Sequence, residues 1–162
     1  MKILIIGHGR HGKDTVAEIL ARDAGLSFAS SSEFACEKAV FPLMADLYDT
    51  PAECYADRAN HRELWYHAIA AYNLRPGPSL TEQILAGHDV YVGMRRRDEF
   101  DNSRHLFGLV VWVDRPGVPP ELEASNALTR ADADLIIYNS GTLADLDVAV
   151  AELVALLDDT PE

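Results

Sequence analysis

The residues best suited to chemistry stand near the start of the chain, where Gly7 and Gly12 enclose four residues and Lys13 follows directly. A loop with the spacing G-x-x-x-x-G-K folds its backbone N–H groups around a phosphate, and its lysine reaches the β- and γ-phosphates of a nucleoside triphosphate. The pattern therefore predicts binding of ATP. The residues expected to bind it are Gly7, His8, Gly9, Arg10, His11, Gly12, Lys13, Asp14 and Thr15.

The loop departs from the common pattern at one position. Asp14 directly follows Lys13, where Ser or Thr is usual, and Thr15 comes one residue later. This ending resembles the nucleotide-kinase variant of the loop, in which Thr15 would take the Mg²⁺ position while Asp14 points into solvent or towards a basic neighbour. The alternative is a glycine-rich turn that only joins a strand to a helix. It is disfavoured because strand, loop and helix all fall where phosphate binding requires them.

A hydroxyl that receives a phosphoryl group benefits from a base that accepts its proton, and two carboxylates are candidates. Glu33 follows the second expected strand, and Asp57 lies in a helical segment. The neighbouring Ser31 and Ser32 are expected to contact the acceptor. Each carboxylate also has a simpler explanation: Glu33 as a favourable charge at a helix N-terminus, and Asp57 as the ion-pair partner of a nearby arginine.

Basic residues are expected on the acceptor side as well. Arg58, His61 and Arg62 occupy positions i, i+3 and i+4, so they share one face if the helix is continuous there. That face would clamp a substrate phosphate, of a free monophosphate or of DNA; the alternative is a solvated basic face. Arg95 follows a buried strand and is the arginine best placed to contact the transferred phosphate, and Arg97 is expected to contact the substrate.

Length and composition limit the class of protein. A chain of 162 residues that is 48% hydrophobic is the size of one domain. Its apolar runs, such as residues 109–113, are too short to span a bilayer, and its first residues begin a core strand instead of a signal peptide, so we expect a cytoplasmic location. Cys36 and Cys54 lack metal-binding spacing and are expected to be small buried hydrophobes.

The net charge of −12 argues against a general nucleic-acid coat protein, but the charge is unevenly distributed. From residue 116 onward there are ten acidic residues and one basic residue, whereas residues 1–115 hold sixteen acidic and thirteen basic residues. A local basic site for a polyanionic substrate is therefore compatible with the acidic whole.

Five apolar runs predict strands at residues 2–6, 26–30, 90–94, 109–114 and 134–138. Helices are predicted at residues 13–24, 32–47, 51–57, 61–72, 80–86, 98–106 and 143–157. Near-continuous apolar strands that alternate with helices are typical of a parallel sheet covered on both faces. We predict one α/β domain over residues 1–162, a P-loop NTPase of the nucleotide-kinase type, with five parallel strands in the order 2-3-1-4-5.

The mostly helical insertion at residues 31–87 is longer than a connection between parallel strands needs. In a P-loop fold it covers the open end of the sheet, so we predict that it binds the acceptor. Trp65 and Tyr66 within it either stack on a base or belong to its core.

Four stretches resemble the phage deoxynucleoside monophosphate kinases: the loop ending Gly12-Lys13-Asp14-Thr15, the strand end Gly93-Met94-Arg95 with Glu99 following, residues 111–118 and residues 137–143. The resemblance implies that Asn139 lines the adenine pocket. It also exposes a departure, because that family usually ends its third strand in Asp-Val-Arg. The missing carboxylate can orient Mg²⁺ or the attacking oxygen, so its absence suggests a changed acceptor or a base supplied from elsewhere.

The sequence more closely resembles a narrower phage group that looks like 5-hydroxymethyluracil DNA kinases. The shared stretches are Gly-His-Gly-Arg-His-Gly-Lys-Asp-Thr at residues 7–15, Ser-Ser-Ser-Glu at 30–33, Ala-Asp-Arg-x-Asn-His-Arg at 56–62 and Tyr-Val-Gly-Met-Arg at 91–95. The resemblance implies that the acceptor is the hydroxymethyl group of a base in already polymerised phage DNA, phosphorylated as a step of thymidine hypermodification.

Together these observations predict a kinase that uses Mg²⁺ and ATP. Lys13 and Arg95 would stabilise the transferred charge, and Glu33 or Asp57 would prepare the acceptor. The preferred acceptor is 5-hydroxymethyluracil in DNA, and the second is a free deoxynucleoside monophosphate. A third interpretation, a nucleotide-binding regulator without an acceptor, is disfavoured because no clear Walker B strand or water-positioning Gln stands out, whereas the insertion suits a second substrate.

Overall fold

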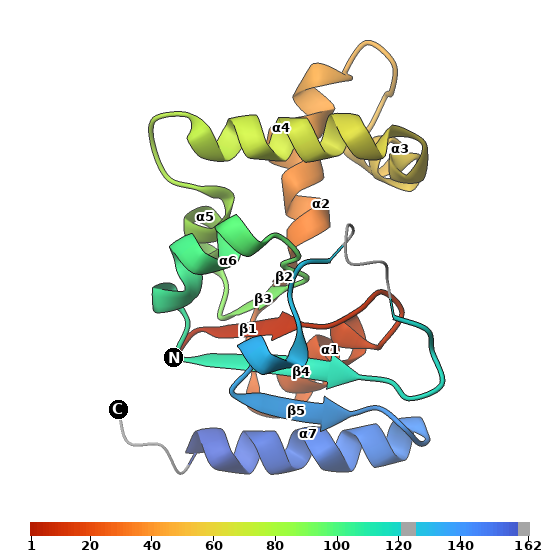
Figure 1. The fold of residues 1–162 in the computed structure, drawn as a ribbon, viewed down its shortest axis with the longest axis vertical. Coiled ribbons are helices and arrows are strands. Elements are labelled where there is room, and N and C mark those ends of the chain that lie inside the picture. The colour runs from red at the N-terminus through yellow and green to blue at the C-terminus, as the bar shows by residue number, and fades with distance from the viewer. Residues whose placement is uncertain (121–125, 159–162) are drawn as a thin grey trace.

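A five-stranded parallel sheet forms the centre of the computed structural model, which describes residues 1–120 and 126–158 (Figure 1). Its strands are β1 (Ile3–Ile6), β2 (Phe28–Ser30), β3 (Val90–Val92), β4 (Leu109–Asp114) and β5 (Leu135–Tyr138). They follow the order β2-β3-β1-β4-β5, and Ile3 is in register with Val90 on one side and Leu109 on the other. The predicted fold class and strand order are confirmed.

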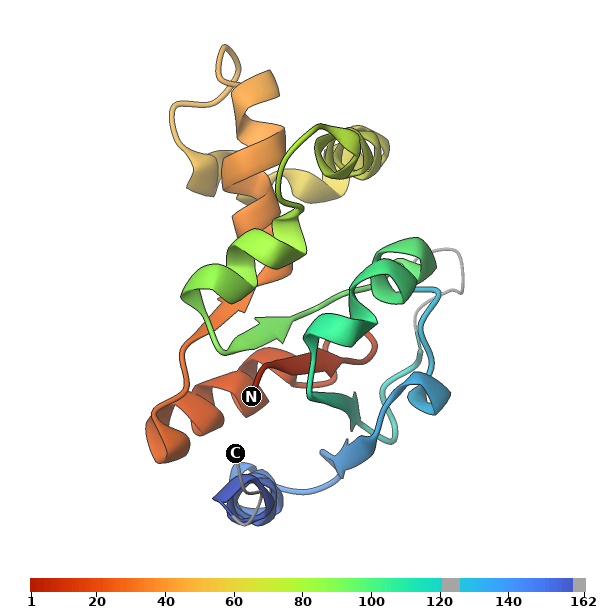
Figure 2. The same cartoon turned by 90° about the vertical axis from the view of Figure 1, so that its left-hand side faces the viewer.

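Helices cover both faces of this sheet, as Figure 2 shows from the side. On one face, α1 (Lys13–Ala24) and α7 (Leu143–Asp158) pack against alternate strand residues such as Ile5 and Val111. On the other face, α5 (Leu80–Gly87) and α6 (Arg97–Ser103) pack against the intervening residues, such as Leu4 and Trp112. Because both faces are buried, the strands read as continuous apolar runs rather than alternating ones.

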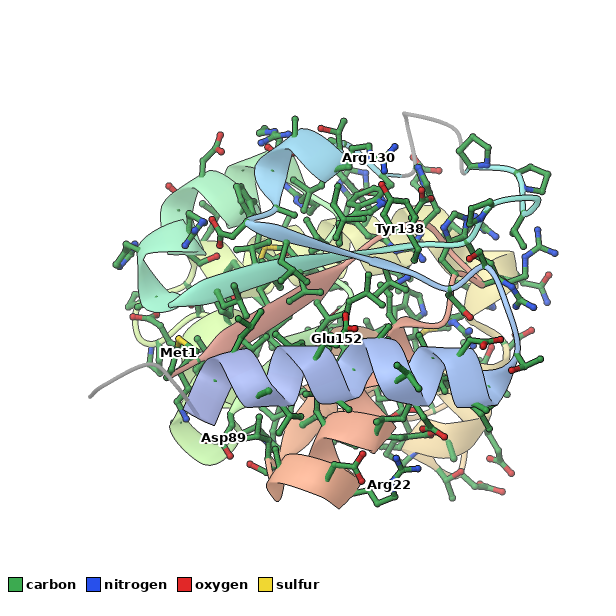
Figure 3. The ribbon with its side chains drawn as sticks, turned by 90° about the horizontal axis from the view of Figure 1, so that it is seen from below. Met1, Arg22, Asp89, Arg130, Tyr138 and Glu152 are labelled. Atoms are coloured by element: carbon green, nitrogen blue, oxygen red, sulfur yellow. The ribbon has the colours of Figure 1, made fainter. Side chains whose placement is uncertain are left out.

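The face formed by α1 and α7 is seen from below in Figure 3. Arg22 of α1 lies at this surface and donates a hydrogen bond to Asp147 of α7 at 3.0 Å. The two helices pack beside each other through apolar residues that include Leu20 and Val150, both fully buried. This packing fixes the position of α1, whose first turn follows the glycine-rich loop.

The insertion between β2 and β3 contains α2 (Ser31–Ala35), a π-helical turn (Cys36–Val40), a 3₁₀ turn (Phe41–Leu43), α3 (Pro51–Ala56), a second 3₁₀ turn (Arg58–His61) and α4 (Arg62–Leu74). It has its own apolar cluster, which includes both cysteines, and stands above the sheet in Figure 1. Cys36 and Cys54 are free and buried, as the sequence predicts.

The sequence prediction of one α-helix over residues 32–47 is wrong. The segment starts as α2, widens into the π-helical turn and ends in the 3₁₀ turn at Leu43. Pro42 lies in that last turn; proline has no N–H to donate to a preceding carbonyl, and its ring clashes with the preceding helical turn.

Most other predicted boundaries of helices and strands lie within two residues of the observed ones. The remaining described elements are two short 3₁₀ turns, Arg104–Leu106 and Arg130–Asp132. Strand β3 ends two residues early because Gly93 has a φ of 100°. Within residues 1–120 and 126–158, none of the helices has the length and apolar character needed to cross a membrane.

Candidate functional site

The loop between β1 and α1 is built from left-handed backbone. Gly7, Arg10 and Gly12 have φ values of 144°, 64° and 95°, and Arg10 is the one non-glycine residue with a positive φ among the described residues. Such turns bring successive N–H groups to one side of the chain, where they form a concave anion site. The loop then enters α1, whose N-terminal dipole adds to its attraction for phosphate.

Two glycines of this loop are required by close contacts as well as by φ. A Cβ on Gly7 would lie 2.5 Å from the carbonyl oxygen of Val113 in β4. A Cβ on Gly12 would lie 2.5 Å from Nδ2 of Asn139, which follows β5. The G-x-x-x-x-G spacing therefore lets the loop sit directly against the ends of two neighbouring strands.

Lys13 begins α1 and turns its ammonium group back into the loop. Its Nζ donates to the carbonyl oxygen of His8 at 2.7 Å, and the residue is 8% exposed. Asp14 is exposed, as predicted, and Thr15 is half-buried. A left-handed loop with an inward-facing lysine and a hydroxyl one residue beyond Asp14 fits the triphosphate and Mg²⁺ that the sequence predicts.

His11 ties this loop to the ends of the neighbouring strands. Its ring is 2% exposed, and its Nδ1 accepts the backbone N–H of Arg115 at 3.1 Å. Its carbonyl oxygen accepts Nδ2–H of Asn139 at 3.0 Å, and the Asn139 N–H donates to the carbonyl oxygen of Asp114 at 2.7 Å. The sequence predicts that His11 and Asn139 both bind the nucleotide. It gives no sign of the hydrogen bond between them, because they lie 128 positions apart.

Replacing Asn139 with alanine is expected to weaken binding of an ATP analogue about five- to tenfold, because a lost hydrogen bond of about 1 kcal/mol loosens the loop. Isothermal titration calorimetry measures this directly. The matched control is Asn73→Ala in the insertion, which removes a bond of 2.9 Å to the N–H of Leu80. Equal effects of both variants on nucleotide affinity would contradict the role of Asn139.

Hydroxyl groups gather on the acceptor side, where β2 passes into α2. Ser30 Oγ lies 3.2 Å from Ser32 Oγ, which lies 3.2 Å from the hydroxyl of Tyr55 on α3. Ser31 is half-buried, and Glu33 is exposed in the first turn of α2. The structure thus brings Ser32, one of the two predicted serines, together with Tyr55, a residue that sequence reasoning missed.

Asp57 is held within the insertion. Its carboxylate accepts hydrogen bonds from the Tyr48 hydroxyl at 2.5 Å and from Asn60 Nδ2 at 2.5 Å, and it lies 3.1 Å from His61 Nε2. The hydrogen bond from Tyr48 contributes most to lowering the pKa of Asp57. A carboxylate stabilised in its charged form is a weak base, so the predicted catalytic role of Asp57 would require this cluster to open.

The predicted basic face of Arg58, His61 and Arg62 does not form as one α-helical face, because a 3₁₀ turn covers Arg58–His61 and α4 starts at Arg62. Arg58 instead lies 4.1 Å above the ring of Tyr55, Arg62 is exposed, and His61 faces Asp57. The irregular turn separates side chains that regular helical spacing would have aligned.

Arg95 and Arg97 follow β3 and take different environments. Arg95 is exposed beyond the strand end, and its carbonyl oxygen accepts the N–H of Ala127 at 3.0 Å. Arg97 donates two hydrogen bonds to Asp132, at 2.7 and 2.8 Å, and a third to the carbonyl oxygen of Ala127. A substrate contact by Arg97 would therefore require these bonds to break.

We expect Arg97→Met and Asp132→Asn each to lower the free energy of unfolding at pH 7 by about 1 kcal/mol, a value discounted for solvent exposure. The hydrogen bond from Arg97 lowers the pKa of Asp132. The stability that this pair adds is therefore present above the ordinary carboxyl pKa and is lost as the pH falls through the lowered pKa. Urea unfolding at neutral and acidic pH measures the free energy of unfolding under both conditions. The exposed Asp46→Asn variant in the insertion is the control. A higher acceptor KM at unchanged stability in Arg97→Met would favour a substrate role instead.

Arg96 connects the segment after β3 with the insertion. Arg96 lies 4.4 Å above the ring of Tyr66 on α4 and pairs with Asp98 through two hydrogen bonds. Tyr66 is 54% exposed, whereas its neighbour Trp65 belongs to the insertion's apolar cluster. Of the two aromatic residues, Tyr66 alone is therefore available to a ligand at this surface.

Solved structures similar to this chain include three kinases from bacteria. Shikimate kinase from Bacteroides thetaiotaomicron matches with 14% identity over 98% of each chain and a TM-score of 0.55. Dephospho-CoA kinase from Campylobacter jejuni matches with 17% identity over 97% of this chain and 98% of its own, with a TM-score of 0.54. Shikimate kinase from Aquifex aeolicus matches with 17% identity over 98% of this chain and 96% of its own, with a TM-score of 0.51.

No protein-family model matches the chain, and neither does any curated protein sequence. At these identities the structural likeness defines the fold. The five-stranded parallel sheet flanked by helices is that of the P-loop kinase fold.

Proposed function

We propose that this protein is an ATP-dependent kinase that phosphorylates the hydroxymethyl group of 5-hydroxymethyluracil in DNA, and that it acts in the cytoplasm. The observation that carries the kinase proposal is the geometry of the loop. Its left-handed residues and the inward-facing ammonium of Lys13 stand at the end of β1 in a P-loop kinase fold. The choice of acceptor is supported by the sequence resemblance and by the chemistry of the insertion.

On the nucleotide side, the loop N–H groups and Lys13 bind the β- and γ-phosphates, and Thr15 offers its hydroxyl to Mg²⁺. Bound Mg²⁺-ATP supplies the phosphoryl group and the charge of the metal. Arg95, beyond the end of β3, neutralises charge that develops on the transferred group. Asn139 keeps the loop in place through His11.

On the acceptor side, guanidinium groups lie over tyrosine rings. Arg58 covers Tyr55, and Arg96 covers Tyr66. A cation beside an aromatic face suits a nucleotide in a strand, because the cation attracts the phosphodiester and the uncovered face of the ring offers a stacking surface for a base. For Arg96 this contact would require its two hydrogen bonds to Asp98 to open. The hydroxyl groups of Ser32 and Tyr55 add hydrogen-bonding partners for the polar edge of a base.

Transfer of label from γ-labelled ATP tests the proposal. The acceptors are an oligonucleotide containing 5-hydroxymethyluracil, a matched thymine oligonucleotide, and deoxynucleoside monophosphates including the hydroxymethylated one. We expect label in the hydroxymethylated oligonucleotide alone, with binding that weakens as salt increases. Label in free monophosphates alone would support a deoxynucleoside monophosphate kinase instead. Slow ATP hydrolysis with no labelled acceptor would support a nucleotide-binding regulator.

A further inference from the structure

A carboxylate outside the nucleotide loop lies in the interior next to β3. Glu99 on α6 accepts two hydrogen bonds at Oε1, from the Tyr91 hydroxyl at 2.8 Å and from the Thr81 hydroxyl at 3.1 Å. Tyr91 belongs to β3 and is 2% exposed; Thr81 belongs to α5 and is 1% exposed. Three elements thus converge on one carboxylate oxygen, and none of these residues has a role in nucleotide binding.

The cluster extends to the acceptor side through Ser31. The side chain of Ser31 acts on the Tyr91 hydroxyl and lowers the pKa of Tyr91. Gly93 ends β3 without a side chain, and the place its Cβ would take is 3.2 Å from Ser31 Oγ. A larger residue there would press against this hydroxyl, which in this chain stays half-buried at the edge of the sheet. Ser31 therefore lies at the edge of the sheet, beside Gly93 and on the side of Tyr91.

We propose that the proton of the acceptor hydroxyl leaves through Ser31 and Tyr91 to Glu99. This inference rests on the proposed kinase function and assigns the groups that take up the proton of its acceptor. As the acceptor oxygen bonds to the γ-phosphorus, its proton passes to Ser31 Oγ, the Ser31 proton passes to Tyr91, and the Tyr91 proton passes to Glu99. The bond between the γ-phosphorus and ADP breaks, and Glu99 becomes a neutral acid. Ser31 contacts the acceptor, whereas Tyr91 and Glu99 are positioning residues.

The hydrogen bond at the end of this path has the required direction, because Tyr91 donates to Glu99. Burial is the main cause that raises the pKa of Tyr91, and the Glu99 carboxylate adds to it, while Ser31 and Thr81 lower it. A monophosphate acceptor has a phosphate oxygen that is already ionised at neutral pH, so it has no use for such a path. An alcohol must lose its proton and needs one.

The surroundings of Glu99 make it a stronger base than an exposed carboxylate. Burial is the main cause that raises the pKa of Glu99, while hydrogen bonds from Tyr91 and Thr81 lower it. The described charged groups that act on it are Arg96, which lowers the pKa, and Asp98, which raises it. Since the ionised form accepts the proton, the rate should fall as the pH drops through this raised pKa. Glu33 is exposed and Asp57 is held by Tyr48, so neither combines burial with a path to the acceptor.

The test compares Glu99→Gln and Tyr91→Phe with the wild-type protein, using Mg²⁺-ATP and the 5-hydroxymethyluracil oligonucleotide from about pH 5 to about pH 9. The amide oxygen of glutamine can still accept both hydrogen bonds, and phenylalanine keeps the ring that packs against Phe107. We expect kcat to fall about 100-fold in both variants at unchanged KM for ATP, and the acidic limb of the pH profile to vanish in Glu99→Gln. Tyr72→Phe, which removes a tyrosine hydroxyl bonded to Gln83, is the control and should match the wild type.

Thermal unfolding shows whether each variant is folded. If Glu99→Gln does not fold, the kcat of Ser31→Ala tests the same proton path at its first residue. Wild-type kcat and an unchanged acidic limb in these variants would overturn the relay and leave the kinase function intact. A wild-type protein that phosphorylates only free deoxynucleoside monophosphates would overturn the alcohol acceptor and the relay together. Failure to transfer phosphate from ATP to any acceptor would instead reject the proposed function itself.

Discussion

Replacing Lys13 with methionine is expected to lower kcat for phosphoryl transfer about 10³-fold, the loss typical of removing a positioned charge from a transition state. Lys13 is 8% exposed and turns its ammonium group onto the loop carbonyl of His8. Methionine has a similar length and is apolar, so it fills the same space without the charge. Steady-state kinetics with ATP and the 5-hydroxymethyluracil oligonucleotide measure the effect.

Lys38→Met is the matched control for this prediction. Lys38 lies in the insertion, where it is 41% exposed and pairs with Glu37. Exposed ion pairs contribute about 0–1 kcal/mol, so this variant should keep both the fold and kcat. A similar loss in both variants would indicate a general effect of removing positive charge, and full activity of Lys13→Met would reject the assigned role of the loop.

Sequence reasoning reached the sheet and the nucleotide loop because their signals are local. The loop spacing lies within nine residues, and each strand is a short apolar run, so the P-loop kinase class and its order β2-β3-β1-β4-β5 could be predicted together. The boundaries of the insertion were harder to predict. Its π-helical and 3₁₀ turns place side chains at angles that regular helical spacing does not give.

The acceptor side shows why the rest could not be predicted. Residues 95–99 form a run of five charged side chains, which by itself indicates a solvated surface. In the structure Arg96 lies over Tyr66, Arg97 pairs with Asp132, and Glu99 turns inward to Tyr91. Each partner lies on a different element, and the separations reach 35 positions. Such contacts depend on how the elements pack, which a single sequence does not specify.

Gly7→Ala is expected to destabilise the protein by about 2–5 kcal/mol and to abolish binding of an ATP analogue. Gly7 has a φ of 144°, and a Cβ there would lie 2.5 Å from the carbonyl oxygen of Val113. That oxygen belongs to the backbone of β4, where Val113 is in register with Ile137 of β5, so it cannot move aside as a flexible side chain would. For a chain of this size, the thermal midpoint should fall by roughly 10 °C.

Gly87→Ala separates this effect from a general cost of losing a glycine. Gly87 ends α5, and a Cβ there would have no neighbour within 4 Å, so alanine should be neutral or slightly stabilising. Calorimetry well below the thermal midpoint then tests nucleotide binding on folded protein. If folded Gly7→Ala still bound the analogue normally, the left-handed shape of the loop would not be what holds the phosphates. A loss of binding confined to Gly7→Ala would instead link the backbone shape next to β4 directly to nucleotide affinity, because Lys13 and Thr15 remain in place in this variant.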